Sequence, residues 1–384
     1  MKRKILVLTE NFPPLSGGSG RWFWELYSRL PRDSFIIVAD QTVEAAEFDR
    51  SHNLNIIRMP LKSTEWGFKS LIGIKFYWRT VQKIRAIIKQ QGITHIHCGR
   101  VIHEGVTAWL LKLLTGTPYL CFVHGEDVET AATSREHNLM VRQVCKQATK
   151  LICNSHNSAN IVKRLGYASS QKIHVLHPGV DASVFVPAQE DDAFKKQMGW
   201  CGRKVVITVG RLQERKGQDM MIRAAALLKE RFPELLYVII GRGDCLANLK
   251  TLVMELQMQQ HVQFLTKASD AQMIQCYQQC DIFILPNRTI GNDIEGFGMV
   301  LVEAQACGKP VIAGDSGGTK ETMSLNKSGY VIDCTDPSNI ATTVATLLAE
   351  PTRCLEMGEA GRQHVESELD WLAHVQKAEL LFSS

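Results

Sequence analysis

Two cations follow a glycine at the end of an apolar run in the second half of the chain. The segment Val209-Gly210-Arg211-Leu212 is followed closely by Lys216-Gly217. We interpret the apolar run as a strand, after which Gly210 lets the backbone turn and both cations emerge from one loop. A guanidinium holds phosphate oxygens through its planar fork, and an ammonium adds a compact charge. Arg211 and Lys216 could therefore stabilise a departing diphosphate, although solvated cations in surface loops are also common.

Two carboxylates stand on either side of a glycine turn further along the chain. The segment Glu295-Gly296-Phe297-Gly298 precedes Met299–Ala306, which is predicted to be helical and contains Glu303. The eight-position spacing keeps both carboxylates from sharing one face of a continuous helix, so Glu295 is expected in the loop. Backbone N–H groups of the turn could meet phosphate, and a carboxylate can accept hydrogen bonds from paired sugar hydroxyls. The alternative is an ordinary solvated acidic pair.

A glycine-rich segment separates the first predicted strand from a helix expected to start near Arg21. It reads Ser16-Gly17-Gly18-Ser19-Gly20. Bare backbone at Gly17, Gly18 and Gly20 can approach an anion closely, and the helix N-terminus adds N–H groups. The pattern matches neither the phosphate-binding loop of kinases nor the dinucleotide fingerprint. A flexible turn explains it equally well.

A histidine also stands at the end of a predicted strand. His124-Gly125-Glu126-Asp127 follows Tyr119–Val123. His124 could hydrogen-bond a sugar hydroxyl near a reacting centre, whereas Asp127 could be a helix cap. A lone histidine is more often structural, so its position is the reason to consider it. No Asp-x-Asp follows a strand to hold a metal that bridges phosphates, and we expect neither a metal nor another cofactor.

Strand and helix patterns alternate along the whole chain and position these residues. The predicted strands are Lys4–Thr9, Phe35–Ala39, Asn55–Met59, His95–Cys98, Tyr119–Val123, Leu151–Cys153, Ile173–Leu176, Val205–Val209, Tyr237–Ile240, Val262–Leu265, Ile282–Leu285, Val311–Ala313 and Tyr330–Ile332. Runs that are apolar throughout suit strands covered on both faces, and strand–helix–strand order favours parallel sheets. We therefore expect an α/β fold with two Rossmann-like, doubly wound domains.

The domain boundary is expected near His177-Pro178-Gly179-Val180-Asp181 and the polar stretch after it. One domain would span residues 1–185 and the other 186–366. The last segment, 367–384, would form a helix that packs back towards the first domain. Ligands of such sheets bind at the carboxyl ends of the strands, so we expect the site in the cleft between the domains.

Charge and composition restrict the class of protein. The chain has 384 residues, of which 45% are hydrophobic and 22% charged, as in soluble globular proteins. Residues 1–185 hold 24 Lys and Arg against 14 Asp and Glu, a net +10. The remaining residues hold 20 Lys and Arg against 25 Asp and Glu, a net charge of −5. This asymmetry indicates an anionic partner for the first half, and we find no nucleic-acid recognition motif.

Neither the amino-terminal segment of the chain nor its cysteines point to export. The basic start and the apolar run Ile5–Leu8 imitate a signal peptide, but the run is short and we predict a buried strand. No apolar stretch is long enough to cross a bilayer, and we expect a cytoplasmic protein. The eleven cysteines include no Cys-x-x-Cys, and several, such as Cys98, Cys121 and Cys153, lie in apolar runs. We interpret them as reduced and structural.

Taken together, the motifs resemble those of the GT-B retaining glycosyltransferases of the family 4 group. They run through most of the chain as Gly17-Gly18-Ser19-Gly20, His124-Gly125-Glu126, Asn154-Ser155, Pro178-Gly179-Val180-Asp181, Val209-Gly210-Arg211-Leu212 with Lys216-Gly217, Glu295 with Glu303, and Gly308-Lys309-Pro310-Val311. Pro286-Asn287-Arg288 and residues 314–321 are most similar to bacterial phosphatidylinositol mannosyltransferases. Leu265-Thr266-Lys267 departs from the family pattern, since many relatives have a glycine after this strand.

The resemblance implies a reaction and its partners. A hexose would move from a nucleotide-diphosphate sugar, GDP-mannose or a UDP-sugar, to a lipid-linked or glycan acceptor in envelope or polysaccharide synthesis. Residues 1–185 would form the acceptor side and 186–366 the donor side. Such enzymes retain the anomeric configuration without a metal, and the leaving phosphate helps to deprotonate the acceptor. No protein carboxylate then acts as a nucleophile, in contrast to most retaining glycosidases.

The resemblance also assigns roles to the matching residues. Arg211 and Lys216 would hold the diphosphate, with the Gly17–Gly20 segment beside it. Glu303 would bind the donor ribose, Glu295 the hydroxyls of the transferred sugar, and His124 the sugar near its reacting face. The remaining donor-binding positions are Gly210, Gly296, Phe297 and Gly298.

A basic segment with aromatic neighbours lies at residues 62–89 and holds seven cations against one acid. On a helix predicted over Ile74–Gln90, an apolar stripe is opposite Lys75, Arg79 and Lys83, with Trp78 nearby. This pattern is typical of a helix packed by its stripe with a solvated basic face. The alternative is a surface that rests on anionic lipid, at the inner face of the cytoplasmic membrane, and presents a lipid-linked acceptor.

Other functions fit the same architecture. A nucleotide-sugar epimerase or hydrolase would release or convert sugar without an acceptor. A non-catalytic nucleotide-sugar-binding partner would bind nucleoside diphosphate without turnover. An NAD-dependent dehydrogenase fits less well, because the glycine-rich segment lacks the fingerprint and its acidic partner downstream.

Overall fold

The computed structural model describes residues 3–15, 17–53 and 55–383, and the chain divides into two compact units. The first unit runs to Pro178 and resumes at His374, and the second spans Gly179–Ala373. Each unit contains one parallel sheet. The α/β fold with two doubly wound domains is therefore confirmed.

The second unit takes up the chain slightly before the boundary expected at residue 185. Val180 bridges to Asp370, and its backbone N donates to Leu369 O at 2.9 Å. The ring of Phe185 is fully buried in the core of the second unit. Residues 179–185 therefore fold with the second unit, because the backbone and side-chain partners of Val180 and Phe185 belong to it.

The first unit is built on a seven-stranded sheet with the order β3-β2-β1-β4-β5-β6-β7. Its strands are β1 (Ile5–Thr9), β2 (Phe35–Ala39), β3 (Ile56–Arg58), β4 (His95–Cys98), β5 (Tyr119–Val123), β6 (Leu151–Cys153) and β7 (Ile173–Val175). The direction of winding reverses between β1 and β4. Such a reversal opens a crevice at the carboxyl ends of the two strands, where ligands of doubly wound sheets bind.

The second unit is built on a six-stranded sheet with the order β10-β9-β8-β11-β12-β13. Its strands are β8 (Lys204–Val209), β9 (Leu235–Ile240), β10 (Val262–Leu265), β11 (Ile282–Leu285), β12 (Val311–Gly314) and β13 (Gly329–Ile332). Here the winding reverses between β8 and β11. Every strand predicted from the apolar runs of both units is confirmed, with ends that agree within a residue or two.

Helices connect the strands of both sheets. The α-helices of the first unit are α1 (Gly18–Ser28), α2 (Ala45–His52), α3 (Leu71–Gln91), α4 (Glu104–Thr115), α5 (Glu126–Ala132), α6 (Arg135–Gln147) and α7 (His156–Arg164). Those of the second are α8 (Asp192–Met198), α9 (Gln218–Leu228), α10 (Leu246–Glu255), α11 (Asp270–Gln279), α12 (Met299–Ala306), α13 (Pro337–Ala349) and α14 (Pro351–His364). The last helix, α15 (Trp371–Ser383), belongs to the first unit from His374 onward.

Shorter helical turns complete the connections. They are η1 (Arg32–Ser34), η2 (Ser170–Lys172), η3 (Glu214–Lys216), η4 (Thr319–Thr322) and the π-helical η5 (Val365–Leu369).

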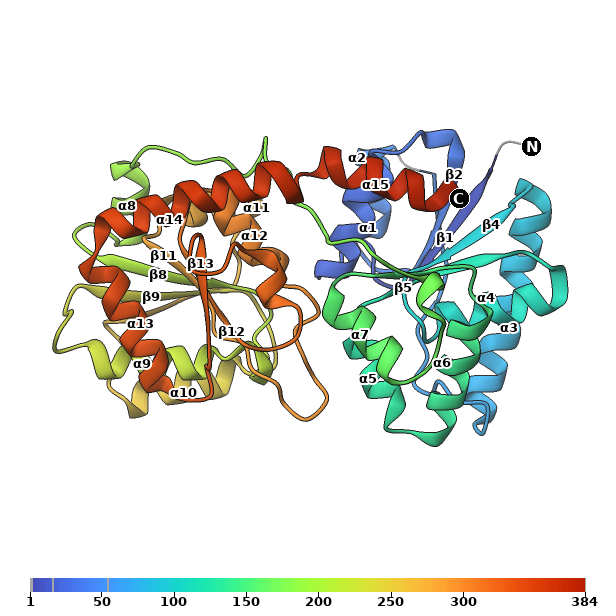
Figure 1. Cartoon of the computed structure of the whole chain (residues 1–384), viewed down its shortest axis with the longest axis horizontal. Coiled ribbons are helices and arrows are strands. Elements are labelled where there is room, and N and C mark those ends of the chain that lie inside the picture. The colour runs from blue at the N-terminus through green and yellow to red at the C-terminus, as the bar shows by residue number, and fades with distance from the viewer. Residues whose placement is uncertain (1–2, 16, 54, 384) are drawn as a thin grey trace. The chain divides into compact units, whose positions relative to one another are not determined.

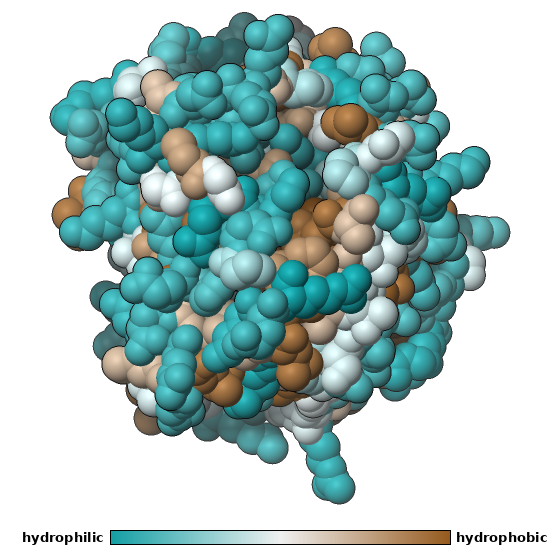
Figure 2. All heavy atoms as spheres, turned by 90° about the vertical axis from the view of Figure 1, so that its left-hand side faces the viewer, coloured by the Kyte–Doolittle hydropathy of each residue, from teal (hydrophilic) through white to brown (hydrophobic). Residues whose placement is uncertain are grey.

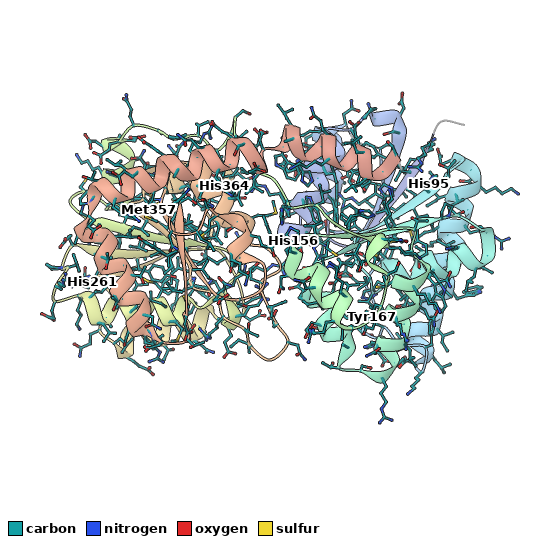
Figure 3. The ribbon with its side chains drawn as sticks, in the orientation of Figure 1. His95, His156, Tyr167, His261, Met357 and His364 are labelled. Carbon is teal, nitrogen blue, oxygen red and sulfur yellow. The ribbon has the colours of Figure 1, made fainter. Side chains whose placement is uncertain are left out.

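The second sheet is covered on both faces, with α9, α10 and α13 on one side and α8, α11 and α12 on the other (Figure 1). Val205, Ile207 and Val209 of β8 pack into the core beside α11 and α12, whereas Val206 packs into the opposite core. Met357 of α14 is buried in that opposite core (Figure 3). This two-sided burial explains why the strands are apolar at successive positions.

The surface of the second unit that faces the viewer in Figure 2 is mainly hydrophilic, with hydrophobic residues in small separate groups. Across the described ranges, no helix combines the length and the apolar character needed to cross a membrane. Cys98, Cys121 and Cys153 are buried free thiols, as the apolar runs around them predicted.

Candidate functional site

A buried carboxylate between two cations marks the carboxyl end of the second sheet. Glu295 Oε2 accepts hydrogen bonds from Lys216 Nζ at 2.5 Å and from Arg215 Nη1 at 2.6 Å. Arg215 Nε also lies 2.9 Å from Asp293 Oδ1. Glu295 and Lys216 are 8% and 9% exposed. The two residues that sequence reasoning assigned to one site are therefore in direct contact within the second unit.

The two cations determine the protonation state of Glu295. Burial alone would raise the pKa of this carboxyl, but the charges of Lys216 and Arg215, with their hydrogen bonds, lower it to about 2. Glu295 is therefore ionised at neutral pH. An ionised carboxylate accepts hydrogen bonds only, which suits it to sugar hydroxyls as well as to the two cations.

Close backbone contact positions the loop that carries the cations. Strand β8 ends at Val209, and the chain passes through η3 to Gly217, which is the N-terminal cap of α9. Gly217 has φ +70°, and a Cβ there would lie 1.7 Å from the carbonyl oxygen of Pro286, just after β11. Only glycine fits this position, so the loop of Lys216 is held against the end of the neighbouring strand.

A second close contact positions the loop of Glu295. Gly317 has φ +67°, and a Cβ there would lie 1.8 Å from the carbonyl oxygen of Glu295. Gly318 N donates to the same oxygen at 2.9 Å. The turn after β12 therefore holds the backbone of Glu295 in place.

Arg211 belongs to the same loop as Lys216 but is solvent-exposed. Its carbonyl oxygen accepts a hydrogen bond from the buried Gln218 side chain at 3.0 Å. Gly210 N donates to Ile240 O at 2.9 Å, which ties the start of the loop to β9. The backbone at Arg211 is thus fixed, and the guanidinium extends from a rigid base.

Glu303 lies on α12, where it is 3% exposed. Its Oε2 accepts a hydrogen bond from the hydroxyl of Tyr277 on α11 at 2.7 Å. Gly298 precedes α12 with φ +98°, and the ring of Phe297 is buried in the core beside α12. The loop of Glu295 and the helix of Glu303 are therefore connected by an anchored turn that includes Gly296.

Sequence reasoning gave no role to Arg215 and considered Arg288 only as part of a resemblance. Arg288 forms a two-pronged ion pair with Asp219 of α9, at 2.8 and 2.9 Å. Its backbone N also donates to Arg215 O at 2.8 Å. Arg215 directly precedes Lys216 in the chain, so these two adjacent cations were the feature of the sequence that could have indicated a role for Arg215.

In the first unit, His124 lies just after β5 and is 5% exposed. Its Nε2 is 2.9 Å from the carbonyl oxygen of Gly99. Burial lowers the pKa of this imidazole, so it is neutral at pH 7. Because a carbonyl can only accept, Nε2 carries the proton and Nδ1 has the lone pair. A neutral His124 could thus accept a hydrogen bond from a hydroxyl through Nδ1.

The glycine-rich segment differs from the expectation in one respect. Helix α1 begins at Gly18, not near Arg21, because Arg21 N already donates to Gly17 O at 3.1 Å. Gly18 and Gly20 therefore lie in the first turn of the helix, and Gly17 is its N-terminal cap. Ser16 lies outside the described residues.

The predicted basic helix is confirmed as α3, which buries Tyr77, Val81, Ile84 and Ile88. A cavity of about 440 Å³ lies beside it in the first unit. Its lining includes four cations and an aromatic ring, Lys62, Lys75, Arg79, Lys83 and Phe76. Trp78 on the same helix is 64% exposed.

Comparison with known proteins identifies two families that together match most of the chain. The model described as Glycosyltransferase Family 4 matches residues 16–184, and the model described as Glycosyl transferases group 1 matches residues 190–364.

Similar proteins match over nearly their full lengths. A GDP-mannose-dependent monoacylated alpha-(1-6)-phosphatidylinositol monomannoside mannosyltransferase of Corynebacterium glutamicum is 30% identical, over 96% of this chain and 95% of that protein. A GDP-mannose-dependent alpha-(1-6)-phosphatidylinositol monomannoside mannosyltransferase of Mycolicibacterium smegmatis is 30% identical, over 98% of each chain.

Solved structures share the fold. HepE of Anabaena, in complex with UDP and glucose, superposes with a TM-score of 0.84 at 19% identity, over 100% of both chains. Sucrose-phosphate synthase of Thermosynechococcus elongatus superposes with a TM-score of 0.82 at 19% identity, over 99% of this chain and 98% of that one.

Proposed function

This chain belongs to the glycosyltransferases of family 4, and on that basis we propose that it transfers mannose from GDP-mannose to a lipid-linked acceptor. Two relatives at 30% identity carry GDP-mannose and a phosphatidylinositol monomannoside in their names, which supports both the donor and the acceptor. The observation that carries the proposal is the contact of Lys216 with Glu295 at the carboxyl end of the second sheet.

The donor is bound by the residues around that contact. Arg211 and Lys216 hold the diphosphate, and the fixed backbone at Arg211 supports this role. Glu295 accepts hydrogen bonds from hydroxyls of the mannosyl group, and its low pKa keeps it ionised for this purpose. Glu303 binds the ribose of the nucleotide.

The reaction proceeds with retention of configuration and without a metal. The bond between the anomeric carbon and the diphosphate oxygen breaks, and the electron pair leaves with the diphosphate. Lys216 and Arg211 stabilise that charge as it develops. The acceptor oxygen forms the new bond on the same face of the sugar, and its proton goes to the departing phosphate. His124 contacts the sugar near its reacting face. Because this imidazole is neutral, it does not supply a proton, and the proton of the acceptor hydroxyl passes to the departing phosphate.

The acceptor reaches the first unit from an anionic lipid surface. Lys75, Arg79 and Lys83 supply charge complementary to such a surface, and Trp78 supplies an exposed aromatic ring. Basic and aromatic side chains on one helix suit the boundary between head groups and acyl chains. The protein is then a peripheral one that works at the inner face of the membrane, in the synthesis of envelope glycolipids or polysaccharides.

The test uses purified full-length chain, radiolabelled GDP-mannose and liposomes that contain phosphatidylinositol monomannoside. We expect label in the lipid fraction, and more of it from GDP-mannose than from UDP-glucose at equal concentration. Thermal shifts with GDP-mannose and UDP-glucose measure donor binding separately. Stabilisation by neither sugar nucleotide would overturn the proposal. Donor consumption at the same rate with and without lipid acceptor would favour a hydrolase.

A further inference from the structure

A second group of charged residues lies in the first unit, at the reversal point of its sheet. Arg100 follows β4, and its charge interacts with four carboxylates, Glu10, Glu104, Glu126 and Asp127. Glu10 follows β1, and Asp127 follows β5. The ion pair of Arg100 Nη2 with Glu126 Oε1 is long, at 3.8 Å. One guanidinium thus faces an excess of carboxylates at three neighbouring strand ends.

Buried polar atoms in this group have no hydrogen-bond partner in the described part of the chain. They are Arg100 Nε, His103 Nδ1, Glu104 Oε2 and Asp127 Oδ2. Glu104 is only 2% exposed and His103 only 4%. Each such atom costs roughly 1–3 kcal/mol of stability when it stays unpaired. A role in folding alone does not account for this concentration of unpaired groups.

The backbone beside these atoms is strained. His103 has φ +63° and ψ −76°, a conformation that a residue with a Cβ rarely adopts. Glu104 follows it directly, and its Oε1 accepts a hydrogen bond from Glu10 N at 2.9 Å. This contact leaves Oε2 as the oxygen without a partner. Strain of this kind is concentrated at functional sites, where side-chain placement matters more than stability.

One side of the group is open to solvent. The side chains of Arg100, Glu126 and Glu10 are 26%, 30% and 17% exposed. Trp66 is 40% exposed, and its ring centre lies 4.5 Å from that of His103. The group therefore has buried atoms at its base and charged side chains with an aromatic ring at its edge.

The unpaired atoms define the chemistry of a ligand. Arg100 Nε can only donate, whereas the oxygens of ionised carboxylates can only accept. Burial and the charge of Glu10 raise the pKa of Glu104, so its second oxygen can also donate when protonated. A hydroxyl both donates and accepts, so neighbouring hydroxyls match this mixture. A metal ion does not match this mixture, because the positive charge of Arg100 at the centre of the group would repel it.

We propose that Glu10, Arg100 and Glu104 bind the hydroxyl groups of a sugar or polyol acceptor, with Trp66 against a carbon face of its ring. This assignment rests on the proposed function, because a transferase is what requires an acceptor. It adds specific contact residues to the acceptor side of the first unit. Carbohydrate sites combine carboxylates, guanidinium groups and aromatic rings for the same reasons of hydrogen bonding and apolar contact.

The test compares three variants of the full chain with a matched control. Glu104→Leu removes both hydrogen-bonding oxygens, Glu104→Gln retains the shape and polarity, and Trp66→Ala removes a ring that is 40% exposed. Glu129→Gln is the control, since Glu129 pairs with Arg164 on the surface of the same unit. Phosphatidylinositol monomannoside serves as the transfer acceptor, and saturation-transfer NMR with methyl α-mannoside and myo-inositol measures acceptor binding directly.

We expect the acceptor KM of Glu104→Leu and Trp66→Ala to rise about tenfold or more, as one or two lost contacts produce. The kcat at saturating acceptor and the thermal shift with GDP-mannose should stay near parental, and Glu104→Gln should recover part of the loss. Parental acceptor KM in Glu104→Leu and Trp66→Ala would overturn the site. If no lipid is mannosylated but polyol binding is lost in Glu104→Leu, the proposed function fails and the polyol site stands. Absence of polyol binding to the parent and of any effect on transfer overturns the site alone.

Discussion

Lys216 and Glu295 are 79 positions apart in the chain, yet Lys216 Nζ lies 2.5 Å from Glu295 Oε2. Arg215 contacts the same oxygen at 2.6 Å. One carboxylate therefore orients two cations at the end of β8, and a diphosphate that binds Lys216 must share it with Glu295. This arrangement fixes the ammonium before the donor arrives, which lowers the entropy lost on binding.

Lys216→Met should abolish most transfer. The substitution keeps most of the length of the side chain but removes the charge that, on the proposed function, stabilises the leaving diphosphate, so kcat should fall about 100-fold or more. Transfer from GDP-mannose at saturating acceptor measures the effect. Lys195→Met is the matched control, because Lys195 also pairs with a glutamate, Glu190, but on the surface of the second unit. A near-parental rate in Lys216→Met would contradict the assigned role.

Arg215→Gln should act on Glu295 rather than on the diphosphate. The change removes the contacts of Arg215 with Asp293 and Glu295 and leaves Lys216 as the cation beside that carboxylate. We expect the KM for GDP-mannose to rise about tenfold with a smaller change in kcat, because the loop of Glu295 loses a restraint. Arg215→Lys should recover only part of the effect, since an ammonium cannot contact both carboxylates through a planar fork. A fall in kcat as large as that of Lys216→Met would instead place Arg215 on the diphosphate.

The pH dependence of the free energy of unfolding should show that the ionised form of Glu295 stabilises the folded chain. Its pKa is lowered to about 2 in the folded chain, from a usual value of 4.5. A carboxyl with a lowered folded-state pKa stabilises the protein above its unfolded pKa, and this stabilisation is lost as the pH falls from about 5 towards 2. The difference corresponds to about 3 kcal/mol at neutral pH.

Urea denaturation of the parent and of Glu295→Gln, at pH 7 and at pH 3, measures this dependence. We expect the parent to lose more stability than the variant between the two values. The other carboxyl groups titrate in both proteins, so the comparison isolates Glu295. Equal losses in both proteins would show that the carboxylate is not stabilised by its two cations.

Local patterns in the sequence were sufficient to predict the strands but not the contacts between loops. Each strand is an apolar run with clear ends, and burial on both faces produces that pattern. The partners of Glu295 depend instead on where the ends of β8 and β11 meet, and the winding of the sheet decides this. The contact of Gly317 with Glu295 shows the same limit, since only tertiary structure reveals which backbone atoms approach a glycine.

His124 shows how much of a site can be predicted from the position of a residue at a strand end. The sequence correctly indicated a histidine after β5, but not that its Nε2 faces the carbonyl of Gly99. Nor did any spacing connect Glu10, which follows β1, with Arg100 and Glu104, which both follow β4. The start of helix α1 was predicted too late because glycines are poor helix formers by themselves. In the structure, the carbonyl oxygen of Gly17 accepts the hydrogen bond that starts the helix.

Charge reversal on α3 should weaken membrane binding. In a triple variant, Lys75, Arg79 and Lys83 become Glu, which replaces attraction to anionic lipid with repulsion. We expect co-flotation with anionic liposomes to fall several-fold, because each basic residue near the surface contributes about 1 kcal/mol. A second triple variant reverses Arg223, Lys250 and Lys327, exposed cations of the second unit, as a control for net charge. Equal recovery of both variants and the parent would remove the membrane from the proposed function.

Tyr277→Phe should weaken donor binding through Glu303. The tyrosine hydroxyl donates to Glu303 Oε2 at 2.7 Å, and both side chains are buried. Without this donor the carboxylate loses one restraint on its orientation. If Glu303 binds the ribose as proposed, we expect the affinity for GDP to fall about three- to tenfold. Isothermal titration with GDP measures this affinity.

Tyr237→Phe is a matched control, because that hydroxyl is also buried and donates to Thr208 at 2.8 Å in the core of the same unit. Both variants should lose about 1 kcal/mol of stability, but only Tyr277→Phe should lose affinity. Equal affinities in the two variants would mean that the hydrogen bond serves folding and that Glu303 is oriented by other contacts.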